Sequence, residues 1–179
     1  AEAVNFDDRS WNVVSTPHTV ELMPAEGSGC RNYQGPAWYR KHFVLPAETK
    51  GQRVVLHFEA AMGKQILYLN GKRIQEHLGG YLPFTLDLTA NGVQAGDSCL
   101  LAVFTDNSDD KSYPPGKRQY TLDFAYHGGI YRDVWMIAKS PVAITDAIDS
   151  QIVGGGGVFV HFDKISEKSA QVYVNTEVQ

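Results

Sequence analysis

Ile66-Leu67-Tyr68-Leu69-Asn70-Gly71-Lys72-Arg73-Ile74 is the stretch that predicts the fold most directly. Its Asn-Gly pair supplies the two positive-φ residues of a tight two-residue turn, so we expect a β-hairpin here. On either side of this hairpin, apolar residues recur with a period of two, and turn residues arrive at short intervals. This pattern indicates antiparallel β structure through most of the chain.

Further segments before residue 140 have the composition of short strands. They are 38–45, 54–58, 81–88, 99–104 and 130–137. We expect 38–45 and 54–58 to pair as neighbours, since only a turn at Lys50-Gly51 separates them. The apolar run 99–104 suits a strand that is buried on both faces. The sequence therefore predicts an all-β fold, a jelly-roll-like antiparallel β-sandwich, with immunoglobulin-like topology as the alternative.

The character of the chain changes after Pro141. An extended stretch at 142–153 and a glycine-rich break precede two strand candidates, 158–160 and 170–174. Fewer than 40 residues are too few for a complete sandwich. We therefore expect a sandwich domain at 1–140 and, at 141–179, an incomplete β segment that opens a second domain.

Charge and hydropathy exclude several classes of function. The net charge is −4, and no basic run is longer than two residues, which disfavours nucleic acid as a partner. No apolar run approaches the ~18 residues of a membrane span, and no signal peptide is visible, so the compartment stays open between cytoplasm and periplasm or secretion. Cys30 and Cys99 lack metal-ligand spacing, and we expect two thiols rather than a disulfide.

The segment from Asp123 to Val134 joins a carboxylate, aromatic side chains and a glycine turn to a strand. Sugars offer hydroxyl groups to a carboxylate and C–H faces to an aromatic ring, so Asp123, Tyr126 and His127 are candidate substrate-binding residues. Each has a plainer alternative. Asp123 would instead cap a turn or pair with a nearby arginine, and the two aromatic side chains would pack against the sheet.

Other polar clusters favour no further chemistry. The run from Asp106 to Asp110 lacks the glycine and distal glutamate of a calcium loop, so we expect a solvated turn. The six histidines show no zinc spacing, and we expect no metal and no cofactor. Trp11, Trp38 and Trp135 lie in or beside apolar patterns, so core filling is the default expectation for them.

Four segments, taken together, resemble the N-terminal sugar-binding domain of glycoside hydrolase family 2, the family of β-galactosidases, β-glucuronidases and β-mannosidases. The resemblance covers roughly residues 6 to 139 and implies a galactose-binding-domain-like sandwich, while the tail from 141 looks like the start of the family's immunoglobulin-like second domain. The segments are Trp11 with Thr16-Pro17-His18, Arg31 to Lys41, Leu67 to Gly71 with His77 to Phe84, and Asp123 to Val134.

In that family, hydrolysis belongs to a later (β/α)8 barrel with two catalytic glutamates. The resemblance implies that this chain carries no catalytic residue, is not catalytic alone, and acts as an accessory domain of a β-glycosidase, with β-galactosidase favoured and β-glucuronidase next. It also implies that Asn32 and Asp123 reach the sugar. Asn32 has an Asx-turn role as its alternative.

The partners implied by the resemblance are a carbohydrate and the catalytic barrel of the same protein, and a homo-oligomer stays open. A free-standing carbohydrate-binding module or lectin is the alternative function. The third alternative is a purely structural β domain.

Overall fold

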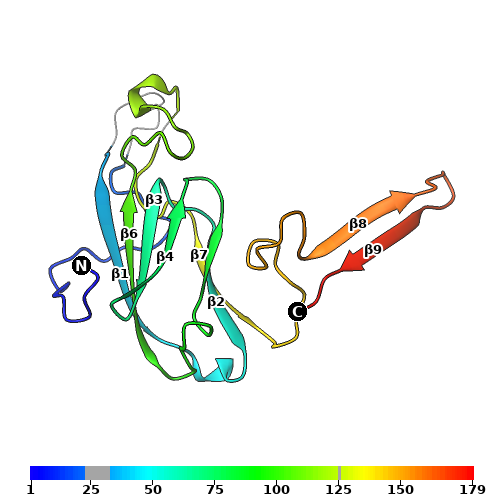
Figure 1. Ribbon diagram of the computed structural model, residues 1–179, viewed down its shortest axis with the longest axis horizontal. Helices are drawn as coiled ribbons and strands as arrows, with labels where there is room; N and C mark the ends of the chain where they lie inside the picture. Colours follow the sequence, from blue (N-terminus) through cyan, green and yellow to red (C-terminus); the bar gives the residue numbers. More distant parts are fainter. Residues whose placement is uncertain (23–32, 125) are drawn as a thin grey trace.

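The computed structural model describes residues 1–22, 33–124 and 126–179. Its strands form two antiparallel sheets and a separate two-stranded ribbon (Figure 1). The first sheet has the order β1-β6-β3-β4, with β1 Pro36–Val44, β6 Ser98–Asp106, β3 Lys64–Leu69 and β4 Lys72–Leu78. The second has the order β5-β2-β7, with β5 Phe84–Asp87, β2 Arg53–Phe58 and β7 Val134–Lys139.

The core lies between these two sheets. Each strand turns alternate side chains inward, as the period-two pattern predicts. At the centre, the rings of Phe58 and Phe84 stack with centroids 4.7 Å apart, and Leu67, Leu86 and Val103 are at most 1% exposed. The all-β antiparallel sandwich predicted from the sequence is therefore confirmed.

The Asn-Gly hairpin is confirmed as the turn between β3 and β4. Asn70 and Gly71 both have positive φ, at 51° and 80°. The Asn70 side chain adds a tie across the sheet, because its Oδ1 accepts a hydrogen bond from the main-chain N–H of Leu100 at 2.8 Å. The turn therefore joins its own hairpin to the neighbouring strand β6.

The expected pairing of 38–45 with 54–58 is wrong. β1 pairs with β6, whereas β2 lies in the other sheet between β5 and β7. The connection contains Pro46 and a short 3-10 helix, η1 Ala47–Thr49, which carries the chain from one layer to the other. A connection of this kind separates the two strands instead of folding them back on each other.

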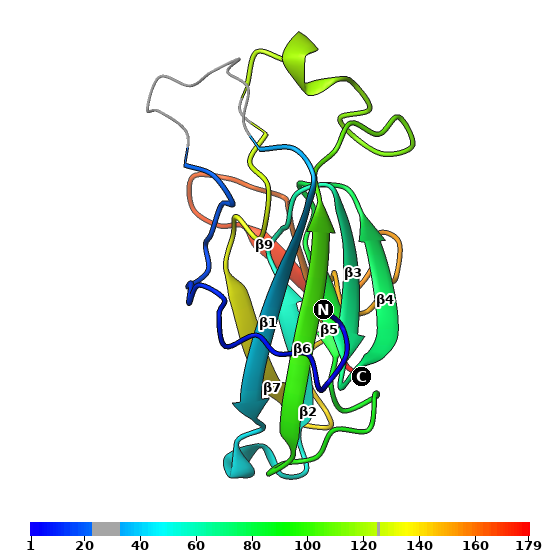
Figure 2. The same ribbon diagram turned by 90° about the vertical axis from the view of Figure 1, so that its left-hand side faces the viewer.

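Strand β6 is buried on both faces, as expected for the run 99–104. Its outer face is covered by the N-terminal segment, which crosses β1 and β6 (Figure 2). Arg40 anchors this segment: its Nε donates to the Asp8 carboxylate at 2.8 Å, and its Nη1 donates to the carbonyl of Ala3 at 3.1 Å. The guanidinium also lies over the Phe6 ring at 5.4 Å.

The expectation that the tryptophans fill the core is wrong. Trp135 is 53% exposed on β7, and Trp11 and Trp38 are half-buried. Trp38 packs on the outer face of the first sheet, against the rings of Tyr68 and Phe104 at 5.7 and 5.3 Å. A large apolar area identifies a residue that packs but does not say on which face of a strand it lies.

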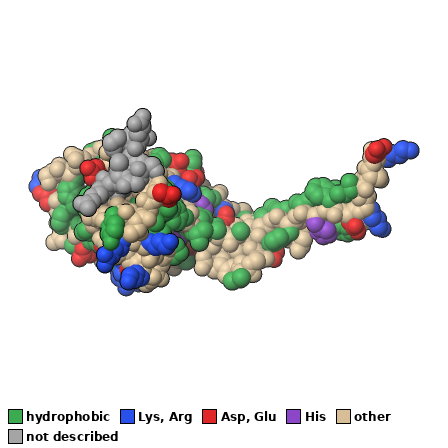
Figure 3. Space-filling model, turned by 90° about the horizontal axis from the view of Figure 1, so that it is seen from above, with side chains coloured by type: hydrophobic (Ala, Val, Ile, Leu, Met, Phe, Trp, Pro, Cys, Tyr) green, Lys and Arg blue, Asp and Glu red, His purple; other side chains and the backbone are tan. Residues whose placement is uncertain are grey.

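The ribbon at the C-terminal end consists of β8 Val158–Asp163 and β9 Gln171–Thr176, and it projects away from the sandwich (Figure 1). The stretch 142–153 is not the single extended segment that the sequence predicts, because it turns at 147–150. One face of the ribbon is apolar and exposed, and Figure 3 shows hydrophobic side chains along it. The side chains of that face are Val158, Val160, Phe162, Val172 and Val174.

Asp149 ties the base of this tail to the outer face of the second sheet. Its carboxylate, 7% exposed, accepts from both terminal nitrogens of Arg53 on β2, with Oδ1 2.9 Å from Nη2. The Nζ atom of Lys139 on β7 lies 3.9 Å from Oδ2 of Asp149. The hydrogen bond to Asp149 is the main cause that raises the pKa of the Arg53 guanidinium.

We expect Asp149→Ala to release the tail from the sandwich. Arg53 keeps Asp87 as a partner, 2.7 Å away, so the sandwich itself should lose only about 1 kcal/mol, because the lost pair is partly exposed. Hydrogen exchange at residues 141–153 measures the release and should rise. Asp163→Ala, an exposed aspartate on the ribbon, is the control. Unchanged exchange in Asp149→Ala would show that the tail is held by other contacts.

Candidate functional site

The candidate site lies at one end of the sandwich, where long loops gather beyond the strands (Figure 2). β6 ends here and β1 begins here, since Asp106 pairs with Pro36. The long connection from β6 to β7 runs over this end and contains a short 3-10 helix, η2 Gln119–Thr121. The predicted residues Asp123, Tyr126 and His127 all belong to this connection.

The predicted residues differ in exposure. Asp123 is exposed, His127 is half-buried, and Tyr126 is buried, with 3% of its surface exposed. Asn32, like Cys30, lies outside the described residues. Arg118, which lies five residues before Asp123 in the sequence, donates a hydrogen bond from Nη1 to the hydroxyl of Tyr120 at 3.0 Å. The sugar-binding roles of Asp123, Asn32, Tyr126 and His127 stay predictions.

The glycine turn after His127 is held by the main chain on both sides. The N–H of Val20 donates to the carbonyl of Gly128 at 2.9 Å, and the N–H of Met62 donates to that of Gly129 at 3.0 Å. Gly129 has φ +109°, and a Cβ there would lie 2.2 Å from the Tyr39 hydroxyl. Glycine is therefore required for the chain to pass this close to β1.

Several tyrosines gather beneath this loop end. Burial is the main cause that raises the pKa of Tyr126, and it raises the pKa of Tyr113 to about 12. Burial also raises the pKa of Tyr81 and of Tyr131, whose hydroxyl donates to the carbonyl of Gly80 at 2.5 Å. These phenols stay neutral near pH 7, so they offer hydroxyl groups and apolar rings rather than negative charge.

The aspartate run after β6 serves the loops. Asp106 Oδ1 accepts from the N–H of Ser108 at 2.8 Å. Asp109 Oδ1 accepts from Gln34 Nε2 and from the N–H of Gln119, both at 2.8 Å.

Within the described part of the chain, no three His, Cys, Asp or Glu side chains are grouped to hold a metal ion. Nor does any helix among those residues have the length and apolar character to cross a membrane.

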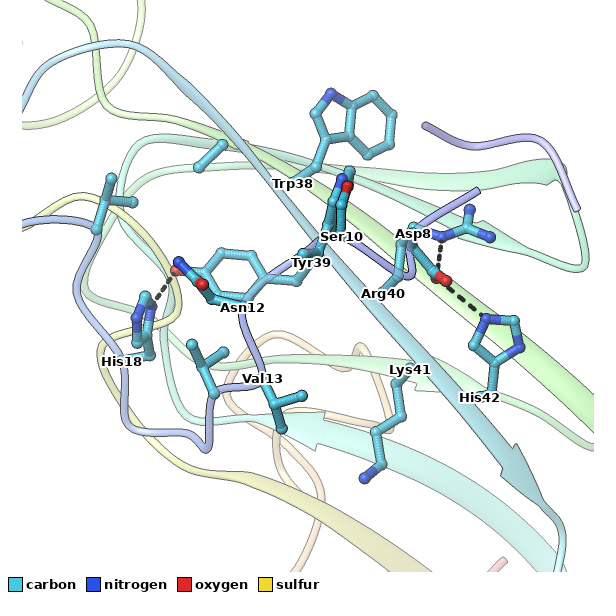
Figure 4. A pocket seen from close by; sticks show the side chains of 14 residues that line it. Asp8, Ser10, Asn12, Val13, His18, Trp38, Tyr39, Arg40, Lys41 and His42 are labelled. Carbon is cyan, nitrogen blue, oxygen red and sulfur yellow. Dashed lines mark hydrogen bonds and ion pairs between the residues drawn. The ribbon is translucent and has the colours of Figure 1, made fainter. Parts of the chain in front are cut away.

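A separate cavity of about 700 Å³ lies between the N-terminal segment and β1 (Figure 4). Five of the polar side chains that line it contact one another: Asp8 accepts from Arg40 at 2.8 Å and lies 3.2 Å from His42 Nε2, while His18 Nδ1 lies 2.9 Å from the Tyr39 hydroxyl. Of the residues that the structure describes, those lining it do not include the three predicted at the loop end. We interpret it as the seam along which the N-terminal segment docks.

An antiparallel β-sandwich with long loops at one end is an architecture that lectin domains also use. The family model described as "Glycosyl hydrolases family 2, sugar binding domain" matches residues 4–141. The chain belongs to this family.

Relatives with known names agree with this assignment. A beta-galactosidase of Thermoanaerobacter pseudethanolicus is 32% identical over 97% of this chain, and a beta-glucuronidase of Formosa agariphila is 32% identical over all of it. A solved beta-glucuronidase from glycoside hydrolase family 2 superposes with a TM-score of 0.81 at 32% identity, covering the whole chain and 20% of that structure. The chain spans 22% and 19% of the two curated relatives, about a fifth of their length.

Proposed function

We propose that this chain is the sugar-binding accessory domain of a β-glycosidase that hydrolyses O-glycosidic bonds of β-galactosides or β-glucuronides. The observation that carries the proposal is the family match over residues 4–141, on a sandwich whose loop end carries Asp123, Tyr126 and His127. Relatives named for both sugars are equally similar, at 32% identity, so the choice between the two sugars rests on experiment.

Glycoside hydrolysis needs two carboxyl groups that flank the scissile bond. We propose that another part of the same protein supplies both, and that this chain contributes one wall of the substrate site. Asp123 is the proposed hydrogen-bond acceptor for sugar hydroxyls, together with Asn32, while His127 and Tyr126 shape the loop beside it. The exposure of the Asp123 carboxylate supports its part in this proposal.

We also propose a division of the chain at residue 140, with 1–140 as the sugar-binding domain and 141–179 as the opening of an immunoglobulin-like domain. The apolar face of the ribbon supports the division, because an exposed two-stranded ribbon is at best marginally stable on its own. In the whole protein, a second sheet would cover that face.

Two measurements test the proposed function. Aryl β-galactoside and aryl β-glucuronide hydrolysis by the whole protein should reveal one preferred substrate, and hydrolysis of neither would refute the proposal. Titration calorimetry of the 179-residue chain with the matching sugar should give millimolar affinity or weaker, since only one wall of the site is present. Micromolar affinity would instead support the alternative, a free-standing carbohydrate-binding module or lectin.

A further inference from the structure

Asn107, directly after β6, joins three segments that are far apart in the sequence. Its side-chain Nδ2 donates to the carbonyl of Tyr33 at 2.7 Å and to that of Tyr126 at 3.2 Å. Its Oδ1 accepts from the N–H of Gly35 at 3.0 Å. One amide therefore connects the end of β6, the entrance to β1 and the chain just before the glycine turn.

The chemistry of these contacts requires an amide. Both N–H groups of the side chain point at carbonyl oxygens, and its oxygen receives an N–H, so the donors and the acceptor are all used. Asn107 is 1% exposed, and water cannot easily replace these partners. An aspartate of the same shape would lack both donors and would place a charge against two carbonyl oxygens.

The surroundings of Asn107 fit it closely. A Cβ at Gly128 would lie 3.0 Å from Asn107 Nδ2 and 3.2 Å from the Tyr33 ring, so the glycine lets the loop approach the amide. Gln119, 8% exposed, donates from Nε2 to the same carbonyl of Tyr126 at 3.3 Å. The carbonyl of Tyr126 is thus held from two directions.

We propose that Asn107 is the positioning residue of the sugar site: it fixes the segment that begins at Tyr33 against the segment that contains Tyr126 and His127. This rests on the proposed function, since Tyr33 directly follows the predicted sugar contact Asn32, and Tyr126 and His127 are themselves predicted sugar contacts. Asn107 is buried beneath the loops and acts through them.

The test is Asn107→Ala in the whole protein, with kinetics on the preferred aryl β-glycoside. We expect kcat/KM to fall about 10- to 100-fold, because a shift of about 1 Å in positioning groups costs on this scale. The loss should lie mainly in KM, since Asn107 holds binding loops and not reacting atoms. Asn107→Asp, which keeps the acceptor but lacks both donors, should lose at least as much as Asn107→Ala.

Asn70→Gly is the matched control. It removes an asparagine side chain that also accepts a main-chain hydrogen bond, at the opposite end of the sandwich, and glycine tolerates the positive φ there. Its melting temperature should fall, whereas its KM should stay within about twofold of wild type. An Asn107→Ala protein with KM and kcat within the same range would overturn the proposal.

Hydrogen exchange separates this proposal from the proposed function. In Asn107→Ala, the amides of residues 33–35 and 126–130 should exchange faster, and in Asn70→Gly they should not. If the wild-type protein hydrolyses neither glycoside, the proposed function fails, and faster exchange confined to these two segments still supports the positioning role. Unchanged exchange in Asn107→Ala refutes that role whichever glycoside is hydrolysed.

Discussion

Gly63→Ala should destabilise the sandwich by about 3 kcal/mol or more, among the largest losses that one methyl group can cause. Gly63 has φ +85°, and a Cβ there would lie 2.0 Å from the carbonyl oxygen of Asp106 and 2.9 Å from the Cα of Asn107. Both atoms belong to the main chain, so no side-chain rotation can relieve the overlap. Either the start of β3 or the end of β6 must move.

Gly92→Ala is the control for this experiment because Gly92 has the same φ, +85°, and nothing within 4 Å of the added Cβ. It should cost only the strain of a left-handed alanine, about 1 kcal/mol. Urea unfolding of both variants measures the difference. Equal losses would mean that the overlap at Gly63 is relieved by a small main-chain shift.

Asp123→Ala should lower kcat/KM of the whole protein about 10- to 100-fold, the effect of removing a charged hydrogen-bond acceptor from bound substrate. Asp123 is exposed on the loop, so the folding stability should hardly change. Asp123→Asn should retain part of the activity, because the amide oxygen still accepts a hydrogen bond. Steady-state kinetics together with a melting curve distinguishes a binding effect from a folding effect.

Asp7→Ala is the matched control for Asp123. Asp7 is an exposed aspartate whose partner, Arg9 at 2.8 Å, is exposed as well. Its removal should leave both kcat/KM and stability near wild type. If Asp123→Ala behaves like Asp7→Ala, Asp123 only serves the loop, and the sugar contact must come from other residues.

Much of the fold could be predicted from local pattern. The Asn70-Gly71 turn, the period-two strands and the run buried on both faces all express constraints that act within a few residues. The partner of β1 could not be predicted in this way. β1 and β2 are close in the sequence, yet the proline and the 3-10 turn between them carry the chain to the opposite sheet.

The candidate site was predictable only in part. The segment around Asp123 combines residue types that suit a sugar, which is a local signal. Asn107 has no such signal: in the sequence it is one polar residue in the run from Asp106 to Asp110, and that run suggests solvated turns. The role proposed for it rests on its hydrogen bonds to the carbonyl groups of Tyr33 and Tyr126, and neither residue is near it in the sequence.

The link between Asp149 and Arg53 has a mechanical consequence. This link holds the tail near residue 149, while the β8-β9 ribbon extends away from the sandwich (Figure 1). A small rotation of the tail about this point would move the far tip of the ribbon by a larger distance. The contact between Asp149 and Arg53 therefore limits how far the tip of the ribbon can move relative to the sandwich.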